Sequence, residues 1–257
     1  MRISAPTTAD VDEVAALVRA SFADRLHPFM TYAQSGIGAF LSAIIEYPLL
    51  FPNHRLLTCR DADEKVTGFA EFRIDGETAL LSYICVAPAA RRAGLARGMI
   101  GDFLNNNSKL TRLDLDVFED NEPAVRLYQH MGFIGMGRSL WLTRPLPVPA
   151  AEVVQPINPA GAIAAHARYG FCEMPVHRNG RQHRLGRIGV RTLRCFEAED
   201  FGDEALLAAV RHLLPELETA LVILPAEQAG RWNGQEVNAS RRMSLELTAF
   251  APTGTAA

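Results

Sequence analysis

The sequence predicts an α/β protein made of two domains. Short apolar runs with strand-like alternation recur along the chain between segments whose apolar residues have helical spacing. The chain has 257 residues, 48% of them apolar, which is enough to bury a core in one large or two small domains. A proline-rich stretch then suggests where to divide it. We therefore predict a first domain at residues 1–145, a linker at 146–160 and a smaller α/β domain at 161–250.

Two helices are predicted near the start of the first domain. The segment from Asp10 to Glu13 has the pattern of a capping box, which begins a helix. The apolar residues in and after it recur at helical spacing: Val11, Val14, Val18 and Phe22. A second apolar helical run, residues 40–45, ends before Pro48, because the residue before a proline disfavours helical geometry.

Strands and two more helices follow in the rest of the first domain. A hairpin is predicted from residues 55–59 and 66–72, and a third strand from 79–86 after an Asp-Gly turn. The order then continues as a helix with apolar Leu95, Met99, Ile100, Phe103 and Leu104, a strand at 113–118, a helix from Pro123 to Gly132, and a strand at 139–142. The sequence thus alternates between the two element types up to the linker.

The predicted second domain repeats part of this order. Strands at 171–176 and 185–196 flank an Asn179-Gly180 turn, and a helix capped by Asp203 follows them. Two further strands are predicted at residues 221–224 and 242–247. The order suggests a degenerate copy of the first domain. The acidic segment after Phe196 would repel a phosphate, so no second cofactor site is expected there.

Composition excludes several classes of protein. The formal net charge of −3 gives no reason to expect nucleic acid or an anionic membrane as a partner. No apolar run approaches the roughly 20 residues that span a bilayer, and the N-terminal residues lack a signal-peptide pattern. We expect a soluble cytoplasmic protein. Its four cysteines are far apart and are expected to be free thiols.

The junction between residues 86 and 96 is the first candidate site. A strand end, a loop of small residues and a helix start follow one another there. Unpaired N–H groups and the dipole at a helix N-terminus attract a phosphate, small residues admit it, and Arg91 and Arg92 add charge. From these residues alone, a plain helix cap with solvated arginines is as good an interpretation as a pyrophosphate site.

Two motifs resemble those of the GNAT superfamily of N-acetyltransferases. Arg91-x-x-Gly94-x-Ala96 after Val86-x-Pro88 resembles its motif A, and the segment from Asn121 to Phe133 resembles motif B, N-x-x-A-x-x-L-Y-x-x-x-G-F. The resemblance covers about residues 1–145. It implies a mixed, largely antiparallel sheet flanked by helices and splayed to admit acetyl-CoA, the acyl donor.

The resemblance also implies roles for individual residues. The main chain at Ile84, Cys85 and Val86 should pair with the pantetheine arm and hold the thioester carbonyl. The pyrophosphate should lie on the loop of Arg91, Arg92, Ala93, Gly94, Leu95 and Ala96. Asn121 should contact the cofactor. Tyr128 should protonate the departing thiolate, although a core tyrosine is the plainer interpretation.

The general base is not given by the resemblance. Some family members carry a glutamate ten residues before motif A, where this sequence has Leu81, so no carboxylate can act from that position. Glu71 on the preceding strand is the substitute, acting directly or through water, and a solvated or ion-paired Glu71 is the alternative. Tyr83 is expected on the same strand face as Leu81, where it could line the acceptor pocket.

Other groupings carry less weight. Histidines and cysteines of the second half have no zinc-site spacing, so no metal is expected. Six arginines between Arg178 and Arg194 could attract an acidic acceptor or form a solvated sheet edge, and the edge is favoured. Cys85 is taken as a packing residue, because direct transfer needs no nucleophile.

The leading hypothesis is an acyl-CoA-dependent N-acetyltransferase that acts on a primary amine of a small molecule or peptide. The alternative is a non-catalytic acyl-CoA-binding regulatory or interaction protein, which the missing glutamate at Leu81 favours. A longer acyl donor is a third option. Acceptor specificity is expected from residues 26–51, with the second domain as a further candidate, and the sequence leaves the acceptor and the existence of a homodimer open.

Overall fold

The structure is a computed structural model that describes residues 2–247. It forms two compact units, and neither is a continuous stretch of chain. Of the described residues, unit 1 contains 2–6, 47–137 and 241–247. Unit 2 contains 7–46 and 138–240. The last residues of the predicted second domain, 248–250, lie outside the described residues.

Unit 1 is a mixed sheet with helices. Its elements are β1 (Arg2–Ser4), β2 (His54–Arg60), β3 (Val66–Asp75), β4 (Thr78–Val86), η4 (Pro88–Ala90), α3 (Leu95–Asn105), β5 (Arg112–Phe118) and α4 (Glu122–His130). The strand order is β1-β2-β3-β4-β5, followed by the end of β14 (Gln235–Glu246). Strands β1 to β4 are antiparallel neighbours, whereas β4 and β5 are parallel. The predicted largely antiparallel sheet is confirmed.

One apolar cluster joins the helices of unit 1 to its sheet. Leu95, Met99, Ile100 and Phe103 of α3 pack with Phe72, Leu81, Leu113 and Leu115 of the strands. The rings of Phe72 and Phe103 stack with centroids 3.8 Å apart. The helical spacing of apolar residues in α3 therefore forms the buried face that the sequence predicts. Burial of this face fixes where the N-terminus of α3 meets the end of β4.

Unit 2 contains the remaining elements. They are η1 (Thr8–Asp10), α1 (Val11–Ala20), η2 (Asp24–Phe29), η3 (Thr31–Ala33), α2 (Ile37–Glu46), β7 (Gln155–Pro156), α5 (Pro159–Tyr169), β8 (Phe171–Glu173), β9 (Val176–Arg178), β10 (Arg181–His183), β11 (Leu185–Ile188), β12 (Thr192–Cys195), α6 (Ala198–Gly202), α7 (Glu204–Leu213), β13 (Thr219–Pro225) and α8 (Ala226–Ala229). Its main sheet has the order β14-β6-β13-β12-β11-β8, where β6 is Ile134–Pro145, and a small sheet has the order β10-β9-β7. Helices α6 and α7 bury their apolar residues in the core of this unit.

The second half of the chain repeats the order of the first. The series β4, α3, β5, α4, β6 corresponds to β12, α6 with α7, β13, α8, β14. In each half a strand crosses through helix to a parallel neighbour, β4 to β5 and β12 to β13. The repeated order confirms the predicted similarity of the two halves.

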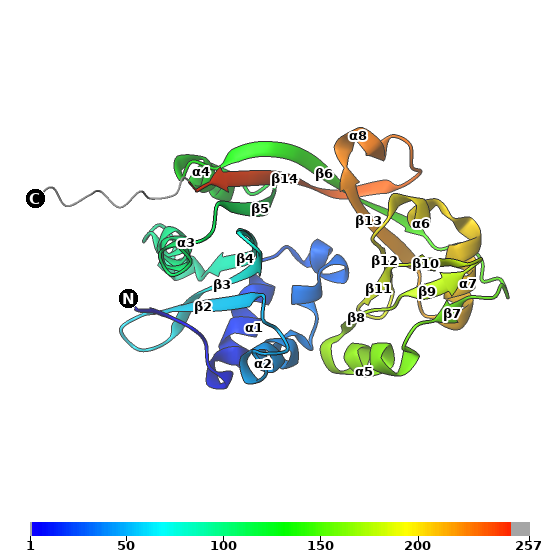
Figure 1. Cartoon of the computed structure of the whole chain (residues 1–257), viewed down its shortest axis with the longest axis horizontal. Helices are drawn as coiled ribbons and strands as arrows, with labels where there is room; N and C mark the ends of the chain where they lie inside the picture. Colours follow the sequence, from blue (N-terminus) through cyan, green and yellow to red (C-terminus); the bar gives the residue numbers. More distant parts are fainter. Residues whose placement is uncertain (1, 248–257) are drawn as a thin grey trace, which may run out of the picture. The chain divides into compact units, whose positions relative to one another are not determined.

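The two halves exchange their last strands. Strand β6 of the first half pairs antiparallel with β13 in unit 2. Strand β14 of the second half ends beside β5 in unit 1 (Figure 1). There Arg242 forms two hydrogen bonds of 2.8 Å with the carboxylate of Asp116. Ser244 likewise donates to Asp114 at 2.7 Å. Each unit is therefore completed by a strand from the other half of the sequence.

The segment that contains α1 and α2 belongs to unit 2. The ring of Phe40 in α2 makes edge contacts with Tyr169 and Phe171, at centroid distances of 5.5 and 5.2 Å. A Cβ on Gly36 would lie 2.4 Å from the backbone oxygen of Arg168, so the absence of a side chain permits this contact. No helix within residues 2–247 is long and apolar enough to cross a membrane.

Two local predictions are wrong. The capping box begins at Thr7, whose N–H donates to the Asp10 carboxylate at 2.7 Å, and Asp10 makes no side-chain cap of α1. A single turn of 3-10 helix before α1 moves the box upstream. The Asn179-Gly180 turn joins the short strands β9 and β10, because Pro175 ends the pairing of β8 and a second turn at Gly189 separates β11 from β12.

Candidate active site

Strands β4 and β5 separate at the centre of unit 1. Their parallel ladder runs from the pair Thr78 and Arg112 to the pair Leu81 and Leu115. Strand β4 continues to Val86 along β3, and its ladder with β5 does not extend past Leu81. A bulge at Ser82 accompanies the separation, since Glu71 pairs with Tyr83 and Phe72 with Leu81. Residues 82–86 are therefore paired with β3 along one backbone edge, and their other edge forms no ladder with β5.

The hydrogen-bond pattern shows which amides face this edge. The N–H of Ala87 donates to the Thr67 carbonyl at 2.8 Å, so these two residues form a hydrogen-bonded pair. Pairs alternate along an antiparallel ladder, which directs the Cys85 N–H toward β3 and the N–H groups of Ile84 and Val86 away from it. Of the three residues predicted to bind the pantetheine arm, Ile84 and Val86 therefore direct their amides toward the space where β4 and β5 separate, whereas Cys85 does not.

The bulge corrects the predicted position of Tyr83. An unbroken strand would place Leu81 and Tyr83 on one face. Leu81 instead shares a face with Phe72 and belongs to the apolar cluster under α3, whereas Tyr83 shares the opposite face with Glu71. Sequence alternation could not reveal this, because one extra residue in the strand reverses every side chain beyond it.

The loop from Arg91 to Ala96 is open and has an unusual backbone. Arg92 and Gly94 both have positive φ, 66° and 77°. Gly94 is the N-cap of α3, and a Cβ added there would meet no atom within 4 Å. Arg91, Arg92, Ala93 and Gly94 are exposed, whereas Leu95 is buried and anchors the helix. The loop is thus held at its helical end and accessible along its length.

This backbone offers several N–H donors. The first helical bond of α3 runs from the Gly98 N–H to the Gly94 carbonyl at 2.8 Å, so the preceding amides point out of the helix. Left-handed residues in such a turn orient successive N–H groups toward one point and form an anion-binding concavity. The Arg91 side chain reaches back to the Val86 carbonyl at 3.4 Å. The geometry fits a pyrophosphate beside the separated strands.

Helix α4 carries the two other predicted residues. Asn121 caps its N-terminus and accepts a hydrogen bond from the Ala124 N–H at 3.3 Å. Tyr128 lies in the same apolar cluster as Leu95 and Met99 of α3, and its ring makes an edge contact with Phe133. Burial raises the pKa of the Tyr128 hydroxyl above its usual value. No hydrogen bond to this hydroxyl occurs among residues 2–247, and it stays protonated at neutral pH.

Glu71 is fully buried and ion-paired. Its carboxylate is 2.7 Å from Nδ1 of His54 and 3.3 Å from Nε of Arg73. His54 was missed in the sequence, because its position opposite Arg73 depends on the register of β2 with β3. The carboxylate fixes the imidazole so that Nδ1 donates and Nε2 is the basic nitrogen. Glu71 is therefore an ion-paired residue, one of the two alternatives to a catalytic base that the sequence left open.

The arginines of the second half mostly have acidic partners. Arg178 contacts Glu152 and Asp203, Arg187 contacts Glu216, and Arg191 contacts Glu218, all within 3.1 Å. The remaining three also have partners: Arg181 has Asp200, Arg184 has Glu173 and Arg194 has the Phe196 ring. In the described part of the chain no group of three or more His, Cys, Asp or Glu residues could hold a metal ion.

Comparison with known proteins agrees with this geometry. Residues 19–133 match the model of the acetyltransferase (GNAT) family. No curated protein matches the sequence. The matched segment contains the separated strands, the loop at Arg91 to Ala96 and helix α4.

Solved structures resemble the whole chain. A tandem GNAT protein from the clavulanic acid biosynthesis pathway is 14% identical, with a TM-score of 0.67 over 95% of this chain and 98% of its own. A GCN5-related N-acetyltransferase from Sphaerobacter thermophilus is 10% identical, with a TM-score of 0.60 over 95% of both chains. A candidate acetyltransferase from Pyrococcus horikoshii is 14% identical, with a TM-score of 0.64 over 96% and 90%. The chain therefore has the fold of these proteins, and its residues 19–133 are similar to the acetyltransferase (GNAT) family.

Proposed function

We propose that the protein transfers an acetyl group from acetyl-CoA to a primary amine of a small molecule or peptide, by direct attack in a ternary complex. The separation of β4 from β5 after Leu81, with the open loop beside it, carries this proposal. Acetyl-CoA supplies an acetyl thioester, whose carbonyl carbon accepts the amine. The chain's own residues bind this group, stabilise charge and move protons.

The main chain of β4 and the loop bind the donor. The outward amides of Ile84 and Val86 hydrogen-bond the pantetheine arm as an added strand would, and one of them stabilises the negative charge on the thioester oxygen. Residues Arg91 to Ala96 hold the pyrophosphate through their amides and the two arginines. Asn121 contacts the donor at the start of α4. The backbone thus supplies most of the binding.

Tyr128 acts as the general acid. Its buried hydroxyl remains protonated, because burial raises its pKa, and it donates that proton to the departing thiolate. We expect Tyr128→Phe to lower kcat by roughly 100-fold, in the range for a lost general acid, with little change in acetyl-CoA affinity. Tyr169→Phe is the matched control, because Tyr169 lies in α5 of unit 2, outside β4, the loop and α4.

Proton removal from the acceptor goes through Glu71 and His54. A fully buried Glu71 cannot touch the acceptor directly, so it holds His54, whose Nε2 accepts the proton through water. His54→Gln should lower kcat/KM by roughly 100-fold, in the range for a lost general base, and leave acetyl-CoA affinity unchanged. Unchanged kcat/KM in a folded variant would remove His54 and Glu71 from the reaction.

The burial of Glu71 also favours a second function. With Leu81 at the family's glutamate position and Glu71 ion-paired, the domain could bind acyl-CoA as a regulatory or interaction protein without catalysis. The discriminating experiment measures CoA thiol release with acetyl-CoA and a panel of amines: a polyamine, an amino sugar, an amino acid and a peptide. Amine-dependent release establishes transfer. Acetyl-CoA binding without release from any amine supports the non-catalytic function.

A further inference from the structure

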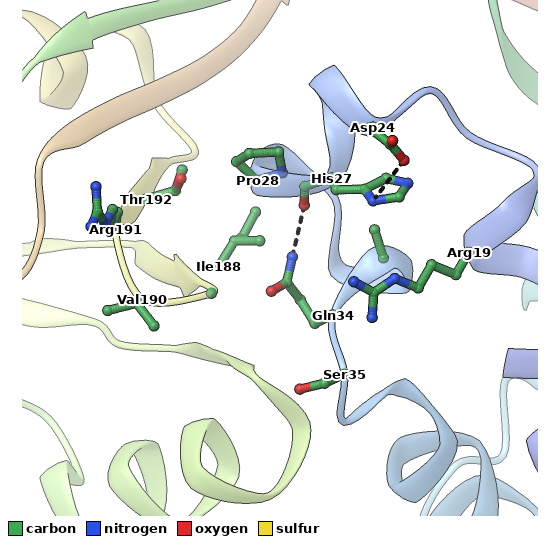
Figure 2. Close-up of a pocket in the computed structure, with 12 residues that line it drawn as sticks. Arg19, Asp24, His27, Pro28, Gln34, Ser35, Ile188, Val190, Arg191 and Thr192 are labelled. Atoms are coloured by element: carbon green, nitrogen blue, oxygen red, sulfur yellow. Dashed lines mark hydrogen bonds and ion pairs between the residues drawn. The ribbon is translucent and has the colours of Figure 1, made fainter. Parts of the chain in front are cut away.

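We propose that unit 2 contains a separate binding site, a cavity that takes a small organic molecule with one carboxylate group. The cavity has a volume of about 410 Å³ and is lined by residues 19–35 and 188–192 (Figure 2). All of these residues belong to unit 2, and none lies in the loop after β4 or in helix α4. The lining includes five residues of the segment 26–51 that is expected to select the acceptor, and the inference of carboxylate binding does not depend on acetyl transfer.

The wall of the cavity is held in place by hydrogen bonds. Gln34 donates from Nε2 to the carbonyl oxygens of His27 and Met30, at 2.8 and 2.9 Å. Figure 2 shows this amide at the centre of the cavity wall, with its oxygen directed toward Ile188. Gly189 has φ of 57°, and a Cβ there would lie 2.9 Å from the Gln34 amide oxygen. The glycine therefore permits the close contact between the two lining segments.

The opposite wall is also anchored from behind. The carbonyl of Gly189 accepts from Nε2 of His166 at 2.7 Å, and the carbonyl of Val190 accepts from Arg187 at 3.1 Å. The Arg191 carbonyl accepts from the amides of Glu218 and Thr219. A turn fixed at three successive carbonyls keeps its shape without a ligand. The cavity is thus largely preformed, as ligand sites usually are.

Thr192 and Arg19 present polar groups to the cavity. Thr192 is 2% exposed, and its hydroxyl makes no hydrogen bond with any residue from 2 to 247. The hydroxyl oxygen keeps some accessible surface, so a ligand or water in the cavity can hydrogen-bond to it. Arg19 forms no ion pair within the same described residues, and Figure 2 shows its guanidinium directed into the cavity.

The charges of the lining select a monoanion. Arg191 is paired with Glu218 at 3.1 Å, and the Asp24 side chain is fully exposed to solvent. Arg19 is the lining arginine without an ion-pair partner among residues 2–247, and a carboxylate matches it in size, charge and fork geometry. A phosphate dianion would meet the nearby Asp24 carboxylate as a second, repelled charge. Ile188, Pro28 and Val190 provide apolar surface for the rest of the molecule.

Three probes of one shape and different charge test the proposal. Benzoate, benzamide and benzylamine carry charges of −1, 0 and +1 on the same ring. We expect saturation-transfer NMR on the full chain to show benzoate binding most tightly. Equal or tighter binding of benzamide or benzylamine, tighter binding of inorganic phosphate, or no binding of benzoate would each overturn the proposal.

Substitutions in the cavity lining test whether benzoate binds in this cavity. Arg19→Gln should weaken benzoate about tenfold, the effect of losing one charged hydrogen bond, and Thr192→Val about threefold. Arg231→Gln is the matched control, since Arg231 is exposed and does not line the cavity. Acetyl-CoA affinity, measured on the same samples, should be unchanged in all three. Benzoate binding that survives Arg19→Gln at full strength in a folded protein would place the ligand elsewhere.

Discussion

The open loop at Gly94 allows a test in which backbone strain and ligand binding are separated. Gly94 and Gly76 both have positive φ, 77° and 58°, and a Cβ at either position would meet no atom within 4 Å. Placing any other residue in this conformation costs about 1 kcal/mol. Glutamate at either position should therefore lower the free energy of unfolding by a similar amount, measured by chemical denaturation.

Only one of these positions should affect the donor. In Gly94→Glu the new carboxylate lies where the pyrophosphate is proposed to bind. It would repel two phosphates and displace charge-assisted hydrogen bonds worth about 1.5–3 kcal/mol each. A loss of about 3–4 kcal/mol corresponds to at least 100-fold in Kd. Gly76 is in the turn between β3 and β4, so Gly76→Glu should leave Kd within about threefold.

Isothermal titration calorimetry with acetyl-CoA measures both constants. Wild-type affinity retained by folded Gly94→Glu would refute the assignment of the loop. An equal loss in both variants would show that strain in the chain, and not occupation of the loop, causes the effect. Micromolar binding that only Gly94→Glu abolishes establishes the donor site and justifies the amine screen.

Three further predictions concern stability and pH. Asp203→Ala removes the cap of α7, where the carboxylate accepts from the Leu206 N–H at 2.9 Å, and should cost about 1 kcal/mol by urea denaturation. Asp12→Ala, an exposed first-turn residue of α1 with no cap role, should cost less than half of that. The raised pKa of Tyr128 means that stability from its protonated form is complete below pH about 10 and is lost as pH rises above that value. The stability difference between wild type and Tyr128→Phe should therefore change above pH 10 and not between pH 7 and 9; a change near neutrality would contradict the raised pKa. A chain ending at residue 150 lacks the segment of β14 with Met243, which is 2% exposed in the core of unit 1, and should fail to show cooperative unfolding by circular dichroism. A cooperative transition like that of the full chain would refute the need for β14.

Sequence reasoning recovered what local chemistry determines. The apolar spacing of α3, the cap at Asp203 and the glycine at the start of α3 each depend on a few neighbouring residues, and the structure places all three as predicted. The roles of Tyr128, Asn121 and the loop stay predictions, because no ligand contact bears on them. Local signals are strong there because the proposed donor site consists mainly of backbone groups in one short segment.

What the sequence missed depends on pairing between distant strands. The bulge at Ser82 and the partner of Glu71 follow from the register of β3 with β2 and β4. No local pattern marks the exchange of β6 and β14 either, since both read as ordinary terminal strands. The cavity at Arg19 and Thr192 joins segments about 170 residues apart in the sequence. Such features can be identified only from the three-dimensional structure.

The exchanged strand β14 has a consequence for how the chain is made. At a synthesis rate of 5–20 residues per second, the roughly 120 residues between Phe118 and Arg241 take about 6–25 s to emerge. During that interval the nascent β5 has an unpaired edge, which exposes it to pairing with other chains. Its outward residues Arg112, Asp114 and Asp116 are charged, and charge on an edge strand opposes such pairing. We therefore expect the carboxylates that later bind Arg242 and Ser244 also to oppose aggregation of the first half of the chain before β14 is synthesised.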